Sequence, residues 1–232
     1  MTAMAPTKTN PPLAEQFSPD ARASDGSVLV PPALPAPREE WPMNLIHRLY
    51  CRSPLWRAEL SRLLPWATDG IPLANSDVLE LGSGPGLTTD WLWPRVATLT
   101  AIEYDAADAA ALAKRLPAVD VRHGDATAMP FADASFEVVL CLTMLHHVPT
   151  IELQDRLIRE ARRVLRPGGI FAGSDSRWGP LFALAHLGDT LQIVDPGLFA
   201  ERLDAVGFSK VDIGIRAKAF RFHAAKPHEN QT

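Results

Sequence analysis

Short apolar runs alternate with segments of helical periodicity from residue 77 to residue 224. Continuous apolar runs predict strands that are buried on both faces, and apolar residues three or four positions apart predict amphipathic helices. Repeated strand–helix units predict an α/β fold, with a doubly wound, mostly parallel seven-stranded sheet, helices on both faces and an antiparallel hairpin at the C-terminal end. The predicted strands are residues 78–81, 96–103, 119–123, 136–142, 170–174, 211–215 and 220–224, and the predicted helices are 87–93, 106–116, 153–164 and 199–206.

The chain before this alternation has a different composition. Nine of the 21 prolines fall in the first 42 residues, so residues 1–40 are predicted to form a disordered Pro-rich arm. Leucines at helical spacing predict a helical cover over residues 41–72, interrupted at Pro54 and Pro65. Residues 73–226 are predicted to form the main domain, followed by a tail, 227–232.

Composition narrows the class of protein. A net charge of −4 argues against binding of nucleic acid through the overall field. No apolar run approaches the ~20 residues that span a bilayer, and no signal peptide is apparent, so we expect a cytoplasmic location. Cys51 and Cys141 fit a reducing compartment, with Cys141 predicted as a buried free thiol. No metal-binding spacing such as C-x-x-C or H-E-x-x-H is present, and we therefore predict no metal.

The most informative stretch runs from a buried strand into three alternate glycines and then into a helix. Glycine is required where the chain turns sharply or where a ligand approaches the backbone, and a turn after the first strand is a typical nucleotide site. The spacing of Gly82, Gly84 and Gly86 differs from the dinucleotide pattern G-x-G-x-x-G, and no P-loop is present. Glu80, just before the glycines, would repel a pyrophosphate and suit a cationic ligand.

From Asp77 to Gly169 the chain resembles class I S-adenosylmethionine-dependent methyltransferases of the small bacterial single-domain type, known as methyltransferase type 11. The resemblance implies a Rossmann-like sheet with S-adenosylmethionine as the cofactor. In that family the pattern E/D-x-G-x-G-x-G wraps the cofactor, and Glu80 with the three glycines matches it. The residues that the resemblance assigns to the cofactor are Glu80, Gly82, Ser83, Gly84, Gly86, Glu103, Tyr104, Asp125, Ala126 and Leu142.

The resemblance also gives individual roles to residues at strand ends. Glu103, which ends the second strand, would accept from both ribose hydroxyls, and a carboxylate can accept two such bonds. Tyr104 would pack on the adenine. Asp125 would accept from the adenine amino group, with the Ala126 amide facing the ring. The segment that begins at Leu142 would lie beside the methionine part of the cofactor.

Methyl transfer is an in-line displacement, in which alignment of nucleophile, methyl and sulfur can supply most of the rate. An acceptor with a weakly acidic group also needs a base. His146 and His147 follow the fourth strand, and Asp175 follows the fifth, so these three are the catalytic candidates. The alternatives are that the histidines pack or line the site and that Asp175 forms a turn. Residues 176–196 form either an acceptor pocket or an amphipathic covering helix.

The sequence is also compatible with other function classes, although we favour a small-molecule acceptor. The Gly-Pro-Gly-Leu-Thr turn also occurs in rRNA adenine dimethylases, but the N-P-P-Y or N-P-P-F sequence that grips a flipped base is missing. A nicotinamide-dependent, NAD(P)-type oxidoreductase would share the fold and the acidic ribose partner, but not the glycine spacing. A catalytically inactive cofactor-binding protein is a further alternative. The sequence indicates neither the acceptor nor the oligomeric state.

Overall fold

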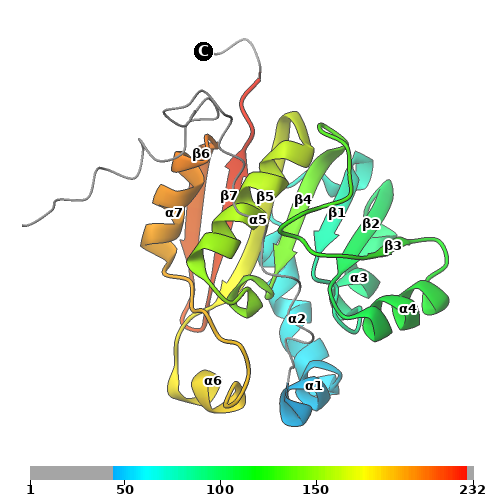
Figure 1. The fold of residues 1–232 in the computed structure, drawn as a ribbon, viewed down its shortest axis with the longest axis vertical. Coiled ribbons are helices and arrows are strands. Elements are labelled where there is room, and N and C mark those ends of the chain that lie inside the picture. The colour runs from blue at the N-terminus through cyan, green and yellow to red at the C-terminus, as the bar shows by residue number, and fades with distance from the viewer. Residues whose placement is uncertain (1–43, 229–232) are drawn as a thin grey trace, which may run out of the picture. The chain divides into compact units, whose positions relative to one another are not determined.

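Residues 44–228 are described by a computed structural model, in which seven strands form one sheet in the order β3-β2-β1-β4-β5-β7-β6 (Figure 1). Strands β1 to β5 are parallel, and β7 runs antiparallel to both β5 and β6. The predicted fold class, including the C-terminal antiparallel hairpin, is therefore confirmed. The strands are β1 (Asp77–Leu81), β2 (Thr98–Glu103), β3 (Asp120–His123), β4 (Phe136–Leu142), β5 (Leu165–Ser176), β6 (Ser209–Ile215) and β7 (Ala219–Ala225).

Helices cover both faces of the sheet because successive strand residues point to opposite sides. Val78 and Leu140 belong to a core with residues of α2 and α3, whereas Leu79 and Cys141 belong to a core with residues of α5 and α7. These strand residues are fully buried, as the continuous apolar runs predict. The helices are α1 (Leu45–Cys51), α2 (Pro54–Ala67), α3 (Leu87–Leu92), α4 (Ala106–Arg115), α5 (Ile151–Val164), α6 (Pro180–Ala185) and α7 (Pro196–Ala205).

Two predicted boundaries are wrong. Pro65 does not interrupt the N-terminal cover, because it lies inside α2. The helix continues past it since Leu64 and Ala67 are fully buried and the Thr68 N–H closes on the Leu64 carbonyl. Strand β5 begins at Leu165 rather than at residue 170, because a register shift opposite β4 lets the Pro-Gly-Gly stretch remain in the sheet.

The predicted arm, residues 1–40, lies outside the described residues, as does most of the predicted tail. Within 44–228, no helix is long and apolar enough to cross a membrane. Cys51 and Cys141 are free, and Cys141 is buried as predicted.

The parallel strands all end at one edge of the sheet. In Figure 1 these ends point downward, and α1 and α6 lie at the same end of the molecule. The glycine turn, Glu103, Asp125, His146 and Asp175 all come at or just after a strand end, so the topology brings them to this edge.

Candidate functional site

The glycine turn has three left-handed residues, but only one of them faces open space. Gly82 (φ +68°) and Gly86 (φ +84°) lie against side chains, since a Cβ atom would collide with Met144 at the first and with Leu112 at the second. Gly84 has φ +52°, and a Cβ there would meet no atom within 4 Å. The glycines therefore have different roles, and Gly84 is the position at which a ligand could approach the backbone.

Glu80 lies beneath this turn, fully buried, and its carboxylate accepts from both hydroxyls of the first turn of α3. The Thr89 hydroxyl donates to Oε2 at 2.6 Å, and the Thr88 hydroxyl donates to Oε1. Burial raises the pKa of Glu80 to about 7, against the two hydrogen bonds that lower it. The structure thus shows Glu80 joining β1 to α3, and its contact with a cationic ligand stays a prediction.

Glu103 joins the ends of β1 and β2. Its carboxylate accepts from the Gly84 N–H at 2.6 Å and from the Asp105 N–H at 2.9 Å, and the residue is only 8% exposed. Burial raises its pKa, and the two backbone bonds oppose that shift. Each carboxylate oxygen has one recorded partner, so each retains a lone pair for a further donor.

The turn after β3 lies next to the turn after β2. The Gly124 N–H donates to the Glu103 carbonyl at 2.9 Å, and the Asp125 charge contributes to a raised pKa of Tyr104, after the effect of burial. One oxygen of Asp125 accepts from the Thr127 N–H at 2.7 Å. The fold therefore brings together Glu103, Tyr104 and Asp125, as the resemblance requires. We name this region, with Gly82–Gly86, the cofactor edge.

The remaining cofactor assignments differ in their surroundings. The Ser83 hydroxyl is buried and has no hydrogen-bond partner, which leaves a polar group available beside Gly84. The Ala126 side chain belongs to the apolar core of the α5 face. Leu142 is only 2% exposed and packs in the core on the α2 face, so any contact with a ligand would involve its backbone. An unpartnered hydroxyl, open space at Gly84 and spare carboxylate lone pairs fit a nucleoside ligand.

His146 and Asp175 form a buried pair at the ends of β4 and β5. The carboxylate of Asp175 is bonded to His146 Nδ1 at 2.5 Å and accepts from the backbone N–H groups of His146 and Ser176 at 3.0 and 2.5 Å. Asp175 is 0% exposed and His146 is 3% exposed. Asp175 therefore positions His146, and the acceptor contact predicted for it does not fit its burial.

His147 belongs to a group of imidazoles that the sequence did not identify. His47 of α1, His147 and His186, which follows α6, offer ring atoms that all lie within 4.8 Å of one another. The rings of His146 and His147 are in contact at an angle of 42°, with centroids 4.1 Å apart. Burial lowers the pKa values of His47 and His147 and lowers that of His186 to about 4. We name these four histidines the histidine edge.

No sequence spacing indicates the histidine edge, because its members come from α1, the β4–α5 connection and the segment after α6. Residues 176–196 are predicted to form either an acceptor pocket or a covering helix. They contain only the six-residue helix α6, followed by an irregular stretch. The Nδ1 atom of His47 lies 2.7 Å from Asp189 Oδ2, which ties α1 to this stretch. The histidine edge could have been predicted from the sequence only by asking which segments cover the strand ends.

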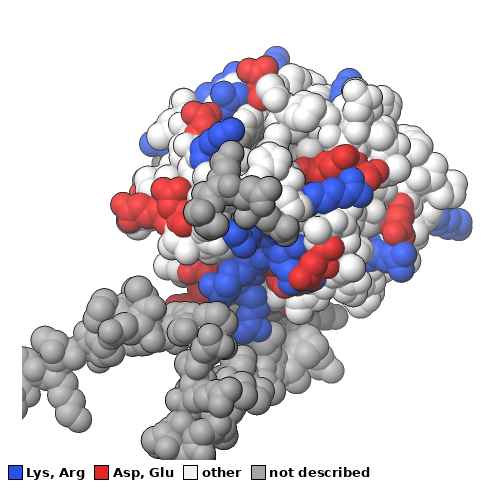
Figure 2. All heavy atoms as spheres, turned by 90° about the horizontal axis from the view of Figure 1, so that it is seen from above, with Lys and Arg blue, Asp and Glu red and all other residues white. Residues whose placement is uncertain are grey.

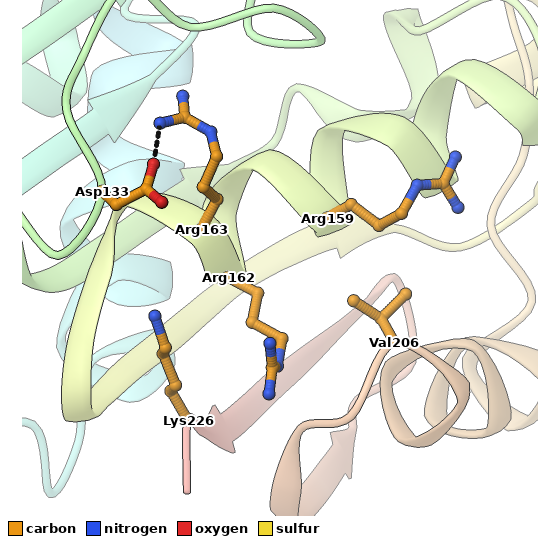
Figure 3. A pocket seen from close by; sticks show the side chains of 6 residues that line it. All are labelled: Asp133, Arg159, Arg162, Arg163, Val206 and Lys226. Atoms are coloured by element: carbon orange, nitrogen blue, oxygen red, sulfur yellow. Dashed lines mark hydrogen bonds and ion pairs between the residues drawn. The ribbon is translucent and has the colours of Figure 1, made fainter. Parts of the chain in front are cut away.

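A basic hollow lies at the opposite end of the strands. It is lined by Asp133, Arg159, Arg162, Arg163, Val206 and Lys226 (Figure 3). Seen from this end, Lys and Arg side chains gather together with acidic residues (Figure 2). Arg163 is bonded to Asp133 and Glu160, Arg162 donates to the Gly207 carbonyl and Lys226 to the Leu165 carbonyl. Arg162, Arg163 and Lys226 thus have hydrogen-bond or ion-pair partners within the protein. The hollow lies far from the cofactor edge and from the histidine edge.

Comparison with known proteins finds similarity over the segment that contains the cofactor edge. Residues 79–173 match the sequence profile of a methyltransferase domain family. A Mycolicibacterium smegmatis protein named as an S-adenosylmethionine-dependent methyltransferase is 38% identical over 98 residues, which is 42% of this chain and 37% of that protein. The ubiquinone biosynthesis O-methyltransferase of Pseudomonas entomophila is 33% identical over 129 residues, 53% of this chain and 54% of that enzyme.

Solved structures agree on the fold. A SAM-dependent methyltransferase from Aquifex aeolicus superposes with a TM-score of 0.60 at 16% sequence identity, covering 77% of this chain and 96% of that one. The chain spans only 37% and 54% of the length of the two curated relatives, so their whole activities do not transfer with the matched segment. Residues 79–173 are therefore similar to methyltransferase domains, one relative over this segment is named as S-adenosylmethionine-dependent, and the fold is shared with a solved S-adenosylmethionine-dependent methyltransferase.

Proposed function

We propose that this protein transfers a methyl group from S-adenosylmethionine to a small-molecule acceptor. The observation that carries the proposal is the bond between the Gly84 N–H and the Glu103 carboxylate at 2.6 Å, because it joins the ends of the first two strands into one candidate site. Asp125 lies next to that site through the Gly124–Glu103 backbone bond. When bound, S-adenosylmethionine supplies a methyl group that is attached to a sulfonium. The sulfur leaves as a neutral thioether, so the leaving group needs no acid.

Each residue at the cofactor edge has a task that suits its surroundings. Two backbone N–H groups hold the Glu103 carboxylate, so it can accept hydrogen bonds from the ribose hydroxyls without a change in its own position. Asp125 is fixed by the Thr127 N–H and retains one oxygen for an amino group. Tyr104 directly follows Glu103 in the sequence, and we propose that it packs on the base of the nucleoside. Glu80 sets the turn from below through Thr88 and Thr89.

The acceptor is proposed to be small and largely apolar. Among the described residues, large apolar side chains are exposed on the helices and segments that surround the histidine edge, including Leu49, Leu55, Trp178, Leu184 and Leu187. Exposed apolar side chains that lie close together commonly mark a binding surface for an apolar molecule. The P. entomophila relative is named for methylation of an oxygen in ubiquinone biosynthesis, which is consistent with an acceptor of this kind.

Catalysis in this proposal depends first on alignment, which can supply most of the rate of an in-line displacement. Base catalysis by His146 or His147 stays a prediction. Asp175 is assigned to positioning, through its three contacts with His146 and Ser176. A cytoplasmic location is part of the proposal and is supported by the two free cysteines.

Calorimetry with S-adenosylhomocysteine tests the proposal directly. We expect one site per chain with a Kd in the micromolar range. NADH and a single-stranded RNA oligonucleotide serve as the competing ligands. Binding of NADH without S-adenosylhomocysteine would indicate an oxidoreductase, and salt-sensitive RNA binding would point to a nucleic-acid acceptor. Transfer of labelled methyl groups to hydroxyl-bearing aromatic compounds would then identify the acceptor class.

A further inference from the structure

The histidine edge contains three imidazoles whose ligand atoms converge. His47, His147 and His186 each offer one ring atom, and the three atoms lie within 4.8 Å of one another. His47 and His186 are 6% and 5% exposed. Three nitrogen ligands bound at ~2.0–2.1 Å in tetrahedral geometry lie about 3.4 Å apart, so small side-chain rotations would complete the arrangement.

On two of these rings, His47 and His186, a hydrogen bond at Nδ1 leaves Nε2 to bind a metal. The Nδ1 atom of His186 lies 2.7 Å from the Phe182 carbonyl, so it carries the proton, and the buried Nε2 atom has no partner. The Nδ1 atom of His47 is bonded to Asp189 at 2.7 Å, which likewise leaves its Nε2 atom. The Thr190 backbone acts to raise the pKa of His147, against the larger effect of burial. Metal-binding histidines usually have this arrangement, in which the second nitrogen donates to a carboxylate or a carbonyl.

The charges around the cluster also favour a cation. Asp189 and Asp175 have side chains that are 1% and 0% exposed. Among residues 44–228, each pairs with a histidine, and no Lys or Arg side chain forms a salt bridge with either one. Buried carboxylates need a compensating charge, and one divalent cation would balance the two.

We propose that His47, His147 and His186 bind one Zn²⁺ ion, with Asp189 orienting His47. Imidazole nitrogen is a preferred zinc ligand, and three histidines leave a fourth coordination position for water or for an oxygen of another molecule. The ion would join α1, the β4–α5 connection and the segment after α6. The competing explanation is a cluster of neutral imidazoles that binds no metal.

Zinc binding by the full-length chain tests the proposal. The chelator-treated protein is titrated with Zn²⁺ by calorimetry, and metal content is measured after dialysis. We expect one Zn²⁺ per chain, and a tetrahedral absorption spectrum when Co²⁺ replaces it. His186→Gln and His47→Gln should each lower the affinity for Zn²⁺ by about 100-fold or more. Asp189→Asn should lower it by about 10- to 100-fold, as expected for a residue that orients a ligand.

His123→Gln is the matched control, because His123 is exposed on β3, away from the cluster. It should bind Zn²⁺ like the unaltered protein. Circular dichroism, measured on every variant, shows whether the fold is retained, and this measurement depends neither on the metal nor on the proposed cofactor. If His47→Gln unfolds, His186→Gln decides. A protein that retains no stoichiometric Zn²⁺, or a His186→Gln variant that binds as tightly as the unaltered protein, would overturn the proposal.

Discussion

The cofactor edge and the histidine edge lie at the same end of one sheet, yet they are assembled in different ways. At the cofactor edge, each residue lies within a few positions of a strand end, and backbone N–H groups make the contacts between turns. The Gly84 N–H donates to the Glu103 carboxylate, and the Gly124 N–H donates to the Glu103 carbonyl. At the histidine edge, contacts join segments far apart in the chain, as when His47 meets Asp189, 142 positions later. Backbone contacts fix the first edge through the sheet topology, whereas the second depends on side chains.

This difference explains what could be predicted. The order of strands and helices, the Gly82–Gly86 turn and the proximity of Glu103 and Asp125 follow from local pattern and the topology of parallel sheets. The resemblance added the cofactor. Sequence reasoning could not foresee that Thr88 and Thr89 would satisfy Glu80, because that depends on the first turn of α3 lying over β1.

The largest effect is expected from Gly84→Val, which tests whether the cofactor edge binds a ligand at all. The new side chain would occupy the open space beside Gly84, so the affinity for S-adenosylhomocysteine should fall by about 100-fold or more, equivalent to about 3 kcal/mol. The left-handed conformation would also cost about 1–3 kcal/mol of stability. Calorimetry and thermal unfolding measure the two effects.

Gly70→Val provides the control for that strain. Gly70 has φ +80° and equally open surroundings, but it lies in the turn after α2. Its substitution should lower stability to a similar extent and leave ligand affinity unchanged. Equal affinity losses in both variants would mean that Gly84 acts through folding and does not contact the ligand.

The pH dependence of stability tests the contact beneath the turn. The pKa of Glu80 is raised from 4.5 to about 7. The contribution of this group to the free energy of unfolding is therefore fully present below pH 4.5 and is lost as the pH rises toward 7. The loss is at most about 3 kcal/mol, since one pKa unit corresponds to about 1.4 kcal/mol. The charges of Glu103 and Asp90 act in the same direction. Glu80→Gln should reduce this slope in urea unfolding measured from pH 4.5 to 8, and an unchanged slope would show that other groups produce it.

Glu103→Ala tests the ribose contact. The variant loses a buried carboxylate that already accepts two backbone bonds, and the affinity for S-adenosylhomocysteine should fall by about 1–3 kcal/mol, or roughly 5- to 150-fold. Asp120→Ala removes an exposed carboxylate from the neighbouring strand β3 and should leave the affinity unchanged. Normal binding by Glu103→Ala would remove the second strand end from the site.

Asp175→Asn tests whether the two edges are independent. An amide in place of the carboxylate keeps one acceptor but turns an N–H group toward donors on His146 or Ser176, so stability should fall by about 1–2 kcal/mol. S-adenosylhomocysteine affinity should not change, because no contact of Asp175 reaches Glu103 or Asp125 among the described hydrogen bonds. A loss of both stability and affinity would show that the histidine edge helps to shape the cofactor site. In that case the ends of β4 and β5 would have to be included in the nucleoside site together with the first three strand ends.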